Sequence, residues 1–515
     1  MTLGHTMNIA LNSMINNQYA LTVVSQNIAN VHVDGYQRQR VNFVTNEYTS
    51  DCETVISTIK GMNGASISSL SNYIDEGAFN DMLDSTSDAN YYNTLANALG
   101  ELEDIADELG ENGLNALLND FFEASVNLEQ FPTDMSIRQQ YVLAAQNICE
   151  KFNEISQKYD GIQVDKFETI ATNVGNINSL LESLASANES NAANCGSPET
   201  ESKIDAILQE LSNYAQVTTT KNDNGTYNFY IGNIMVVEGN KVKYNLETEF
   251  DPTNIENVVQ FSLRSTENPN YVIENGVNDS FATGSMKAYL DFLNGTNQGF
   301  SNINDMKANI NAAANAFATA LNNIQTYDDG NGVFAASLTT APDGSLNLEK
   351  STKPMFISTD GGALNASNMT INPEIIENPF VVAAARIDLE KFTDENGNVD
   401  PNWVKAIGNS DNATEITALQ HAKICSYGGG QNNCTLSDFL INNAAKNGMD
   451  AANIQNKADT AQNIADMDAT NFANMIGVNL DEELADMIKY QRAYEASAKI
   501  FSTANNLIDS ILAMV

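Results

Sequence analysis

The last stretch of the chain, residues 480–515, reads LDEELADMIKYQRAYEASAKIFSTANNLIDSILAMV and contains neither proline nor glycine. Steps of four and three residues alternate along one line of side chains, namely Leu480, Leu484, Met487, Gln491, Tyr494, Ala498, Phe501, Asn505, Ile508, Leu512 and Val515. This spacing is typical of a seam along which helices wind around one another. At 1.5 Å per residue the helix would be roughly 54 Å long. Asn479 is positioned to cap its start, and Asp481, Glu482 and Glu483 lie in its first turn, where the helix dipole favours anions. A helix of that length has little to pack on within its own globule, so we expect it to need a partner helix.

A second seam of the same kind lies at the opposite end of the chain, within residues 6–30. Its members are Met7, Leu11, Met14, Gln18, Leu21, Ser25 and Ile28. Polar residues in a seam, here Gln18 and Ser25, cost stability but can fix the register of the pair. Long amphipathic helices more often pack within one bundle than between subunits, but two seams at the extreme termini favour a shared pair. We predict that the terminal helices pair with each other and then with neighbouring subunits.

Between the two seams, the spacing of apolar residues changes from helical to alternating and then back to helical. Helical spacing covers residues 86–187 and is interrupted at Phe131–Pro132, because proline cannot donate a backbone hydrogen bond. Asp134 or Ser136 is positioned to cap the helix that follows, and residues 188–200 are expected to form a loop. Alternating residues with turn signals at Asn224–Gly225 then predict β-hairpins. Helical spacing returns after the β-rich stretch.

These patterns predict a mostly α-helical protein with β-rich insertions and discontinuous, nested domains. The terminal helices would form a coiled-coil-like inner domain. The expected pieces are an inner domain of 1–50 plus 465–515, a connector of 51–85, a helical domain of 86–215 plus 283–335 plus 372–464, a β-rich insert of 216–282 and a short outer insert of 336–371. A chain that goes out and comes back allows its two ends to meet.

The charge of the chain excludes some classes of partner. Among 515 residues, 66 are acidic and 25 are basic, and the formal net charge is -41. Nucleic acid is not expected as a partner, because phosphates are bound by Lys and Arg. No run of about 18 apolar residues occurs, so we expect no membrane insertion. The first residues lack the basic and apolar regions of a signal peptide, so we expect no cleaved signal.

No motif in the sequence carries a recognisable chemistry. The Walker, GxSxG and HExxH patterns are absent. The stretch 394–400 resembles a calcium loop but has Val399 where the loop needs glycine and Lys405 where it needs glutamate, so a turn before Pro401 is the better reading. We therefore expect no catalytic, cofactor-binding or metal-binding residues.

The cysteines do not form the pattern of a disulfide scaffold. The five are scattered over the chain, at Cys52, Cys149, Cys195, Cys425 and Cys434. Cys425 and Cys434 flank a short glycine- and asparagine-rich stretch and could close a small loop. Two free thiols are the interpretation that the sequence favours.

Motifs at both ends resemble those of the bacterial flagellar rod, hook and hook-associated proteins. The matching residues are Ser25, Asn27, Ile28, Ala29, Asn30, Gly35 and Tyr36 at the N-terminal end, and Gly477, Val478, Asn479, Tyr490 and Gln491 at the C-terminal end. Within this superfamily, residues 113–155 resemble the helical domain of the hook-associated protein 1 family, whose members form the first hook–filament junction.

The resemblance implies a structural role outside the cell. Members of that family are exported through the flagellar type III apparatus and assemble as a helical ring at the distal end of the hook. They serve there as an adaptor to the filament. The implied partners are the flagellar hook protein, other copies of the chain, the second hook–filament junction protein and a cytoplasmic export chaperone that holds the C-terminal helix. The resemblance implies no cofactor.

Two alternatives stay open from the sequence. A flagellar hook or rod protein would share the terminal motifs but would have a β-dominated middle, whereas residues 86–187 are expected to be helical. A secreted enzyme or adhesin carried on flagellar-type ends would need a site in the middle of the chain, and no motif there supplies one.

Overall fold

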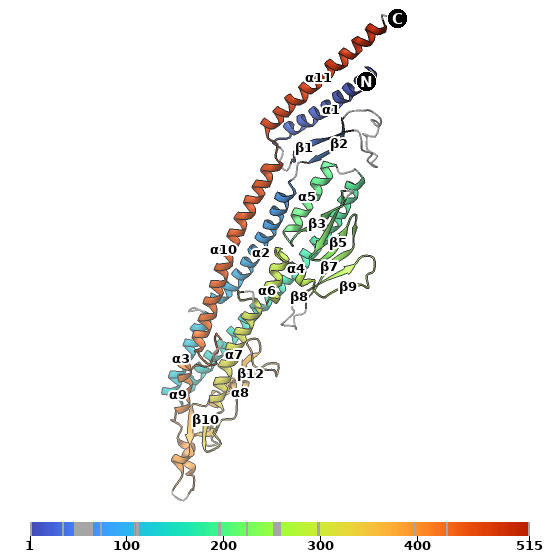
Figure 1. Ribbon diagram of the computed structural model, residues 1–515. Coiled ribbons are helices and arrows are strands. Elements are labelled where there is room, and N and C mark those ends of the chain that lie inside the picture. Colours follow the sequence, from blue (N-terminus) through green and yellow to red (C-terminus); the bar gives the residue numbers. More distant parts are fainter. Residues whose placement is uncertain are drawn as a thin grey trace.

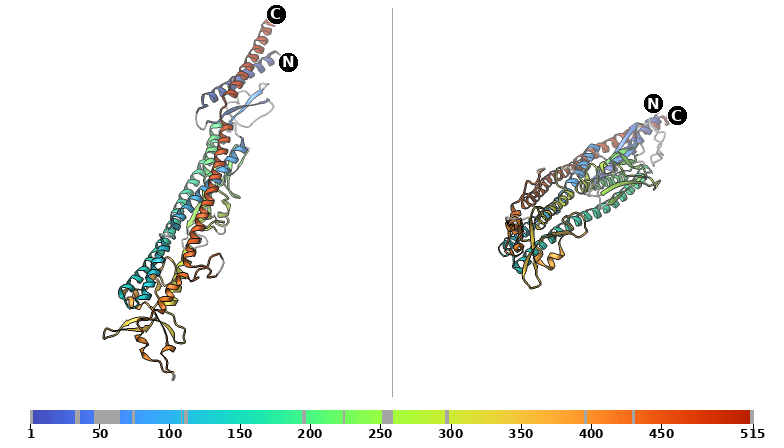
Figure 2. Two further views of the ribbon diagram at one scale, coloured as in Figure 1. Left: turned by 90° about the vertical axis from the view of Figure 1, so that its left-hand side faces the viewer. Right: turned by 90° about the horizontal axis from the view of Figure 1, so that it is seen from below.

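The chain forms an elongated rod with both termini at the same end (Figure 1). This computed structural model describes residues 3–32, 36–45, 65–72, 75–107, 109, 113–193, 197–222, 225–250, 259–295, 299–394, 397–428 and 431–512. Among these residues, no helix is long and apolar enough to cross a membrane. Three regions follow one another along the rod: a terminal helix pair, a helical body with a β-rich flank, and a small outer lobe (Figures 1 and 2).

The terminal helix pair consists of α1 (Leu3–Ala29) and α11 (Leu480–Leu512), which lie side by side. An antiparallel hairpin of β1 (Gln39–Thr45) and β2 (Ala65–Asn72) packs against α1. Its small apolar core joins Ala20 and Val23 of α1 to Val41 of β1. The predicted pairing of the terminal helices is therefore present within a single chain.

Long helices form the body. The largest are α2 (Glu76–Asp107), α3 (Leu114–Gln130), α4 (Met135–Ala193) and α10 (Leu436–Ile476). At 1.5 Å per residue, the 59 residues of α4 span about 90 Å, most of the length of the body. Buried apolar residues such as Phe152, Ile155 and Tyr159 recur along α4 every three or four positions and build the main core.

Local signals explain where these helices begin and end. The break between α3 and α4 falls at Phe131–Pro132, as predicted, and Asp134 caps α4 by accepting from the Ser136 N–H at 2.7 Å. Helices α2 and α10 run side by side with small residues between them, because Ala89 meets Ala461 and Ala465 there. Further along, the rings of Phe79 and Phe472 contact each other in a tilted arrangement, with centroids 5.2 Å apart.

The β-rich flank lies against α4 and forms two antiparallel sheets. Their strands are β3 (Thr218–Lys221), β4 (Tyr227–Ile231), β5 (Ile234–Glu238), β6 (Lys241–Val242), β7 (Tyr244–Phe250), β8 (Val259–Ser265) and β9 (Val272–Ile273). Asparagines of α4 attach the sheets. Asn178 both donates to and accepts from the backbone of Leu246 at 2.8 Å, and the buried Asn188 bonds Tyr227 in the same two-way manner.

Shorter helices complete the body: α5 (Pro198–Ser212), α6 (Gly284–Asn294) and α7 (Ile303–Gln325). The start of α6 lies very close to the backbone of the residues that follow α5. A Cβ on Gly284 would lie 2.5 Å from the Tyr214 carbonyl, and the residue has φ +87°. Only glycine fits this position without displacing the end of α5.

The outer lobe has its own small core and sits at the end opposite the termini. Strand β10 (Val333–Thr340) is the middle strand between β11 (Leu346–Lys350) and β14 (Ala385–Asp388). The remaining short elements here and nearby are β12 (Phe356–Ser358), β13 (Met369–Ile371), α8 (Pro373–Glu377) and α9 (Asp411–Ala418), with single turns of 3-10 helix at Pro379–Val381, Leu389–Phe392, Pro401–Lys405 and Leu419–His421.

The structure corrects three details of the predicted elements. Helix α2 begins at Glu76, about ten residues before the expected start near 86. The segment 188–200, expected to be a loop, continues α4 to Ala193 and already starts α5 at Pro198. Residues after 372 were expected to be helical, but β14 there pairs with β10, because its alternating side chains complete the core of the outer lobe. The division into domains stays a prediction.

Candidate assembly interface at the chain ends

Asn27, at the end of α1, is the centre of a polar cluster that joins the two ends of the chain. Its amide nitrogen donates to the Gln39 carbonyl at 2.9 Å and to Glu483 Oε2 at 3.1 Å. Its carbonyl oxygen accepts from the Tyr36 hydroxyl at 2.9 Å and from the Gln39 N–H at 3.1 Å. Asn27 and Glu483 are each only 1% exposed. A buried amide and carboxylate must be paired to be tolerated, and here both are.

Arg38 supplies the positive charge of this cluster. Its Nε lies 2.6 Å from Glu483 Oε1, and its Nη1 lies 2.6 Å from Glu482 Oε2. Asp486 is 3.8 Å from the third guanidinium nitrogen. Burial alone would lower the pKa of Arg38, but the Glu482 and Glu483 carboxylates outweigh burial and the pKa is raised. The guanidinium therefore stays charged and holds the first turn of α11. We call Asn27, Tyr36, Arg38, Glu482 and Glu483 the terminal clasp.

Backbone geometry places the first turn of α11 within reach of Arg38. Helix α10 ends at Ile476 and is followed by Gly477, whose Cβ, if present, would lie 2.9 Å from the Ala473 carbonyl. The Arg38 N–H donates to the Ile476 carbonyl at 2.9 Å and so occupies an acceptor at the end of α10. Asn479 then caps α11, accepting from the Asp481 N–H at 3.0 Å, as predicted.

The clasp is connected to the helical body through the neighbouring residue Gln37. Its side chain donates to Asp205 Oδ2 at 3.3 Å and accepts from the Ser202 hydroxyl at 3.1 Å, both on α5. Burial raises the pKa of Asp205 to about 6, against an ordinary value of 3.8. The segment 36–39 therefore contacts α1, α5, α10 and α11 at once.

A polar cavity of about 310 Å³ adjoins the clasp. Its walls are formed by residues of α1, β1 and α11, and both Arg38 and Glu483 line it. Among the described residues, no group of three or more His, Cys, Asp or Glu could hold a metal ion. In the stretch that resembles a calcium loop, Asp394 accepts from the Asn398 N–H at 2.8 Å.

The line of contact between α1 and α11 has a heptad spacing and is antiparallel. Ser497 donates to Ser13 Oγ at 2.8 Å, Tyr490 packs on the core around Ala20, and Asn27 bonds Glu483. Each step is seven residues forward on α1 and seven residues back on α11. The residues of α1 on this line are small or polar, which allows the two backbones to approach closely.

The predicted seams coincide with this line only in part. On α11, Met487, Tyr494, Phe501 and Ile508 are half-buried, in agreement with a seam position. The leucines of the predicted α11 seam are turned outward instead, since Leu484 is 50% and Leu512 is 68% exposed, and Leu480 is exposed as well. On α1, Leu11, Gln18 and Ser25 are exposed, and the fully buried positions are Ala10, Asn12, Asn16, Ala20, Val23, Val24 and Asn27.

The offset on α1 has a simple geometric origin. Met7, Met14, Leu21 and Ile28 are only partly buried, so the predicted seam is displaced by about one residue from the observed contact face. One residue corresponds to a rotation of about 100° around a helix. The larger apolar side chains were expected to face α11, but in the single chain that place is taken by Ser13, Ala20 and Asn27. Whether the predicted seam serves a neighbouring subunit stays a prediction.

The residues of the family motif are distributed unevenly around the clasp. Asn27 and Tyr36 belong to the clasp, and Gly477 and Asn479 form the junction between α10 and α11 next to it. Tyr490 packs beside the clasp, with its ring 6.3 Å from that of Phe43. The others lie on the surface or partly buried: Ser25, Ala29 and Gln491 are exposed, and Ile28, Asn30 and Val478 are half-buried. Gly35 lies outside the described residues, as do Val515, Cys52 and Cys195.

Sequence reasoning did not identify Glu483 as a member of the site. The three acidic residues that open α11 were explained by the helix dipole, which favours anions at an N-terminus. That reason applies to Glu482, which is 59% exposed, but a fully buried Glu483 needs a specific cation. The available signal was the rarity of basic residues in this chain, which makes an arginine next to the Gly35–Tyr36 motif unusual.

Comparison with known proteins is consistent with this arrangement. Residues 99–334 match the domain family described as "Flagellar hook-associated protein FlgK helical domain", and residues 469–514 match "Flagellar basal body rod FlgEFG protein C-terminal". The chain is 25% identical over 508 residues to flagellar hook-associated protein 1 of Bacillus subtilis, covering 96% of this chain and 95% of that one. These matches confirm the resemblance to flagellar hook-associated protein 1 that the motifs at both ends of the chain indicate.

One further relative and one solved structure are also similar to this chain. Flagellar hook-associated protein 1 of Salmonella typhimurium is 22% identical over 574 residues, covering 98% of this chain and 99% of its own. The flagellar hook junction protein FlgK of Burkholderia pseudomallei has a similar solved structure, with a TM-score of 0.57 and 14% identity over 76% of this chain and 99% of that one. At that identity the structural likeness concerns the fold alone. The predicted fold class, helical with inserted β-sheets, is confirmed.

Proposed function

We propose that this protein is a structural component of the bacterial flagellum that serves as an adaptor at the hook–filament junction. The observation that carries the proposal is the terminal clasp, which fixes the first turn of α11 and the end of α1 and so sets an antiparallel pair at one end of the rod. The similarity to flagellar hook-associated protein 1 along nearly the whole chain supports the same role.

The surface of α11 supports assembly with further subunits. Apart from its contact line with α1, this helix exposes Leu484, Ile488, Ile500, Leu507 and Ile511, each about half exposed. Apolar residues along one long helix are costly in water unless another surface covers them. Repeated contact of this surface with a different surface of the next copy would generate an open helical array. We infer that other copies of the chain are the first partners.

We propose the further partners from the resemblance to the hook-associated proteins. The flagellar hook protein lies on one side of the junction, and the second hook–filament junction protein on the other. A cytoplasmic export chaperone would cover the apolar surface of α11 before assembly, in keeping with secretion through the flagellar type III apparatus. The final location is then the extracellular flagellum. The proposed role is structural rather than catalytic.

The helical body distinguishes this proposal from the related one of a hook or rod protein. Residues 76–193, which in a hook or rod protein would be dominated by β-structure, form α2, α3 and α4 in this chain. The domain match over 99–334 carries the name of a hook-associated protein. The alternative of an enzyme or adhesin has no supporting site among the described residues.

Charged substitutions on the outer surface of α11 test the proposal. We expect the double variant Leu484→Glu/Ile488→Glu to fold with an unchanged helical content but to fail to join the flagellum, leaving hooks without filaments and flagellin in the medium. The matched control is Ser502→Glu/Asn506→Glu, which adds the same charge to exposed polar positions of the same helix. The readouts are electron microscopy of cells and flagellin in the culture supernatant. Normal filaments on cells with the Leu484→Glu/Ile488→Glu protein would contradict the proposal.

A further inference from the structure

Cys425 and Cys434 lie directly opposite each other on two antiparallel backbone segments. They exchange both backbone hydrogen bonds, with N–O distances of 3.2 and 3.3 Å. Residues paired in this way have Cα atoms about 5.5 Å apart and side chains on the same face. That separation lies within the range of about 4.4–6.8 Å that a disulfide spans. The Cys434 thiol is also directed toward its partner, 3.5 Å from the Cys425 carbonyl oxygen.

Contacts within the loop hold the pair in this position while both cysteines are thiols. The Asn432 N–H donates to Ser426 Oγ at 3.0 Å. Asn433 accepts from the Tyr427 N–H at 2.9 Å and donates to the Tyr427 carbonyl at 2.6 Å. The two segments are therefore already aligned, so closing a bond between the sulfurs needs little rearrangement of the backbone.

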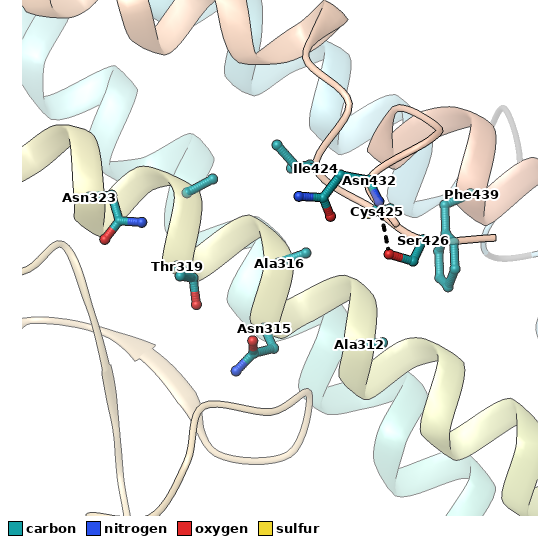
Figure 3. Close-up of a pocket in the computed structure, with 11 residues that line it drawn as sticks. Ala312, Asn315, Ala316, Thr319, Asn323, Ile424, Cys425, Ser426, Asn432 and Phe439 are labelled. Carbon is teal, nitrogen blue, oxygen red and sulfur yellow. Dashed lines mark hydrogen bonds between the residues drawn. The ribbon is translucent and has the colours of Figure 1, made fainter. Parts of the chain in front are cut away.

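The cysteine pair also lies at an accessible place in the fold. Figure 3 shows Cys425, Ser426 and Asn432 on a loop that faces α7, beside a cavity of about 470 Å³. Cys425 is buried against this cavity and Cys434 is half-buried. The residue after Cys434 is Thr435, the N-cap of α10, which accepts from the Asp438 N–H at 3.1 Å. A bond at this position would fix the start of α10.

We propose that Cys425 and Cys434 are a redox site that forms an intramolecular disulfide by exchange with a low-molecular-weight disulfide such as oxidised glutathione. In the first step the Cys434 thiolate attacks one sulfur of the small disulfide, giving a mixed disulfide and releasing one small thiolate. In the second step the Cys425 thiolate attacks the Cys434 sulfur, forming the S–S bond and releasing the second small thiolate. Two protein thiols are oxidised, one small disulfide is reduced to two thiols, and two protons pass from the cysteines to the released thiolates.

The order of these two steps follows from burial. Burial raises the pKa of Cys425 to about 12, and it also raises the pKa of the less enclosed Cys434. Thiolates are the attacking species in exchange, so both steps accelerate as pH rises. Cys434 is the thiol that a small disulfide can reach, and Cys425 then resolves the intermediate. This site goes beyond the proposed function and does not depend on it.

The test uses the purified full-length chain, reduced and then equilibrated with oxidised and reduced glutathione. Remaining thiols are blocked with an alkylating agent and the chain is mapped by mass spectrometry. We expect a linked peptide pair containing Cys425 and Cys434 whose mass is lower by two hydrogens than that of the two free peptides. Cys149, buried in the N-terminal third of α4, serves as the internal control, and we expect it to be alkylated only after unfolding.

Two single variants test the order of the steps. We expect Cys425→Ser to accumulate the mixed disulfide of glutathione on Cys434, because the resolving thiol is absent. We expect Cys434→Ser to leave Cys425 largely unmodified until the chain is unfolded. Full alkylation of both cysteines in the wild-type chain after equilibration, or links from either one to Cys52 or Cys195 instead, would overturn the proposal. Circular dichroism of each variant verifies that the fold is retained.

Discussion

Glu483 shows how a single buried carboxylate can organise two distant chain segments. It bonds Asn27 and Arg38, which precede it by more than 440 residues. A buried ion pair contributes little net stability compared with apolar packing, but removing one partner leaves the other uncompensated. The residue therefore specifies which parts of the two ends meet more than it adds to overall stability.

Substitution of Glu483 by Gln tests this interpretation. We expect Glu483→Gln to lower the free energy of unfolding of the terminal region by about 1–3 kcal/mol, because Arg38 loses its buried partner. Glu482→Gln is the control, since that side chain is more than half exposed and its pair should contribute less than about 1 kcal/mol. Hydrogen exchange at residues 36–39 and in the first turn of α11 measures the loss of stability in both variants. Equal protection in the two variants would contradict the role of the clasp.

Asp205 should make the stability of the protein depend on pH. Its pKa of about 6 in the folded state exceeds the ordinary 3.8, so between these values the folded chain binds the proton more tightly than the unfolded chain does. Stability contributed by this group therefore falls as pH rises from about 4 to 6, by up to about 3 kcal/mol. We expect Asp205→Asn to raise the melting temperature at pH 7 but not at pH 3.5. The exposed Asp81→Asn is the control, and an equal effect at both pH values would refute the assignment.

At the scale of elements, the sequence predicted helices whose limits are set by local signals. The proline at 132, the cap at Asp134 and the cap at Asn479 each act within a few residues, so their effects can be inferred without tertiary information. Strand β14 is too short to be recognised from its sequence alone, and it forms a strand only because β10 lies beside it. Its pairing is a tertiary effect that no local pattern reveals.

The rotational setting of α1 could not be predicted for a related reason. Its apolar residues occur on more than one face, and the face that meets α11 carries Ala20, Ser13 and Asn27 rather than the larger Leu11. Helical periodicity identifies an amphipathic helix but not which of two faces meets a partner in the same chain. The clasp was missed for the same reason, because it depends on Arg38 and Glu483 meeting in space.

Gly477 separates α10 from α11, and its replacement tests the need for that break. We expect Gly477→Ala to destabilise the terminal pair by about 1–2 kcal/mol, because the new Cβ would lie 2.9 Å from the Ala473 carbonyl. Gly448→Ala, within α10, should instead stabilise by up to about 1 kcal/mol, since its Cβ meets its nearest neighbour at an ordinary 3.5 Å. We expect urea unfolding to give changes of opposite sign in the free energy of unfolding of the two variants. A stabilising effect of both variants would show that the break is dispensable.

At the scale of the whole molecule, burial is distributed unevenly along the rod. The main core extends through α2, α3, α4 and α7, whereas among the described residues only three buried ones form the separate core beside α1. Local stability follows the amount of buried apolar contact, so the terminal end should open more readily than the body.

Hydrogen exchange of the isolated protein measures this gradient directly. We expect amides of α1 and α11 to exchange at least tenfold faster than those in the middle of α4, and to become protected when the protein is assembled with other subunits. The turns of the outer lobe provide an exposed reference. Strong protection of both terminal helices in the unassembled protein would contradict partner-dependent stability of the terminal pair.

The hydrogen bond from the Arg38 N–H to the Ile476 carbonyl has a mechanical consequence for a rod-shaped protein. It joins the segment that follows α1 to the end of α10, so it opposes independent tilting of these two segments. A bending load applied to α11 passes at this point into α10 and, through Gln37, into α5. Two helices of the body therefore share a force that would otherwise be concentrated on the single turn at Gly477.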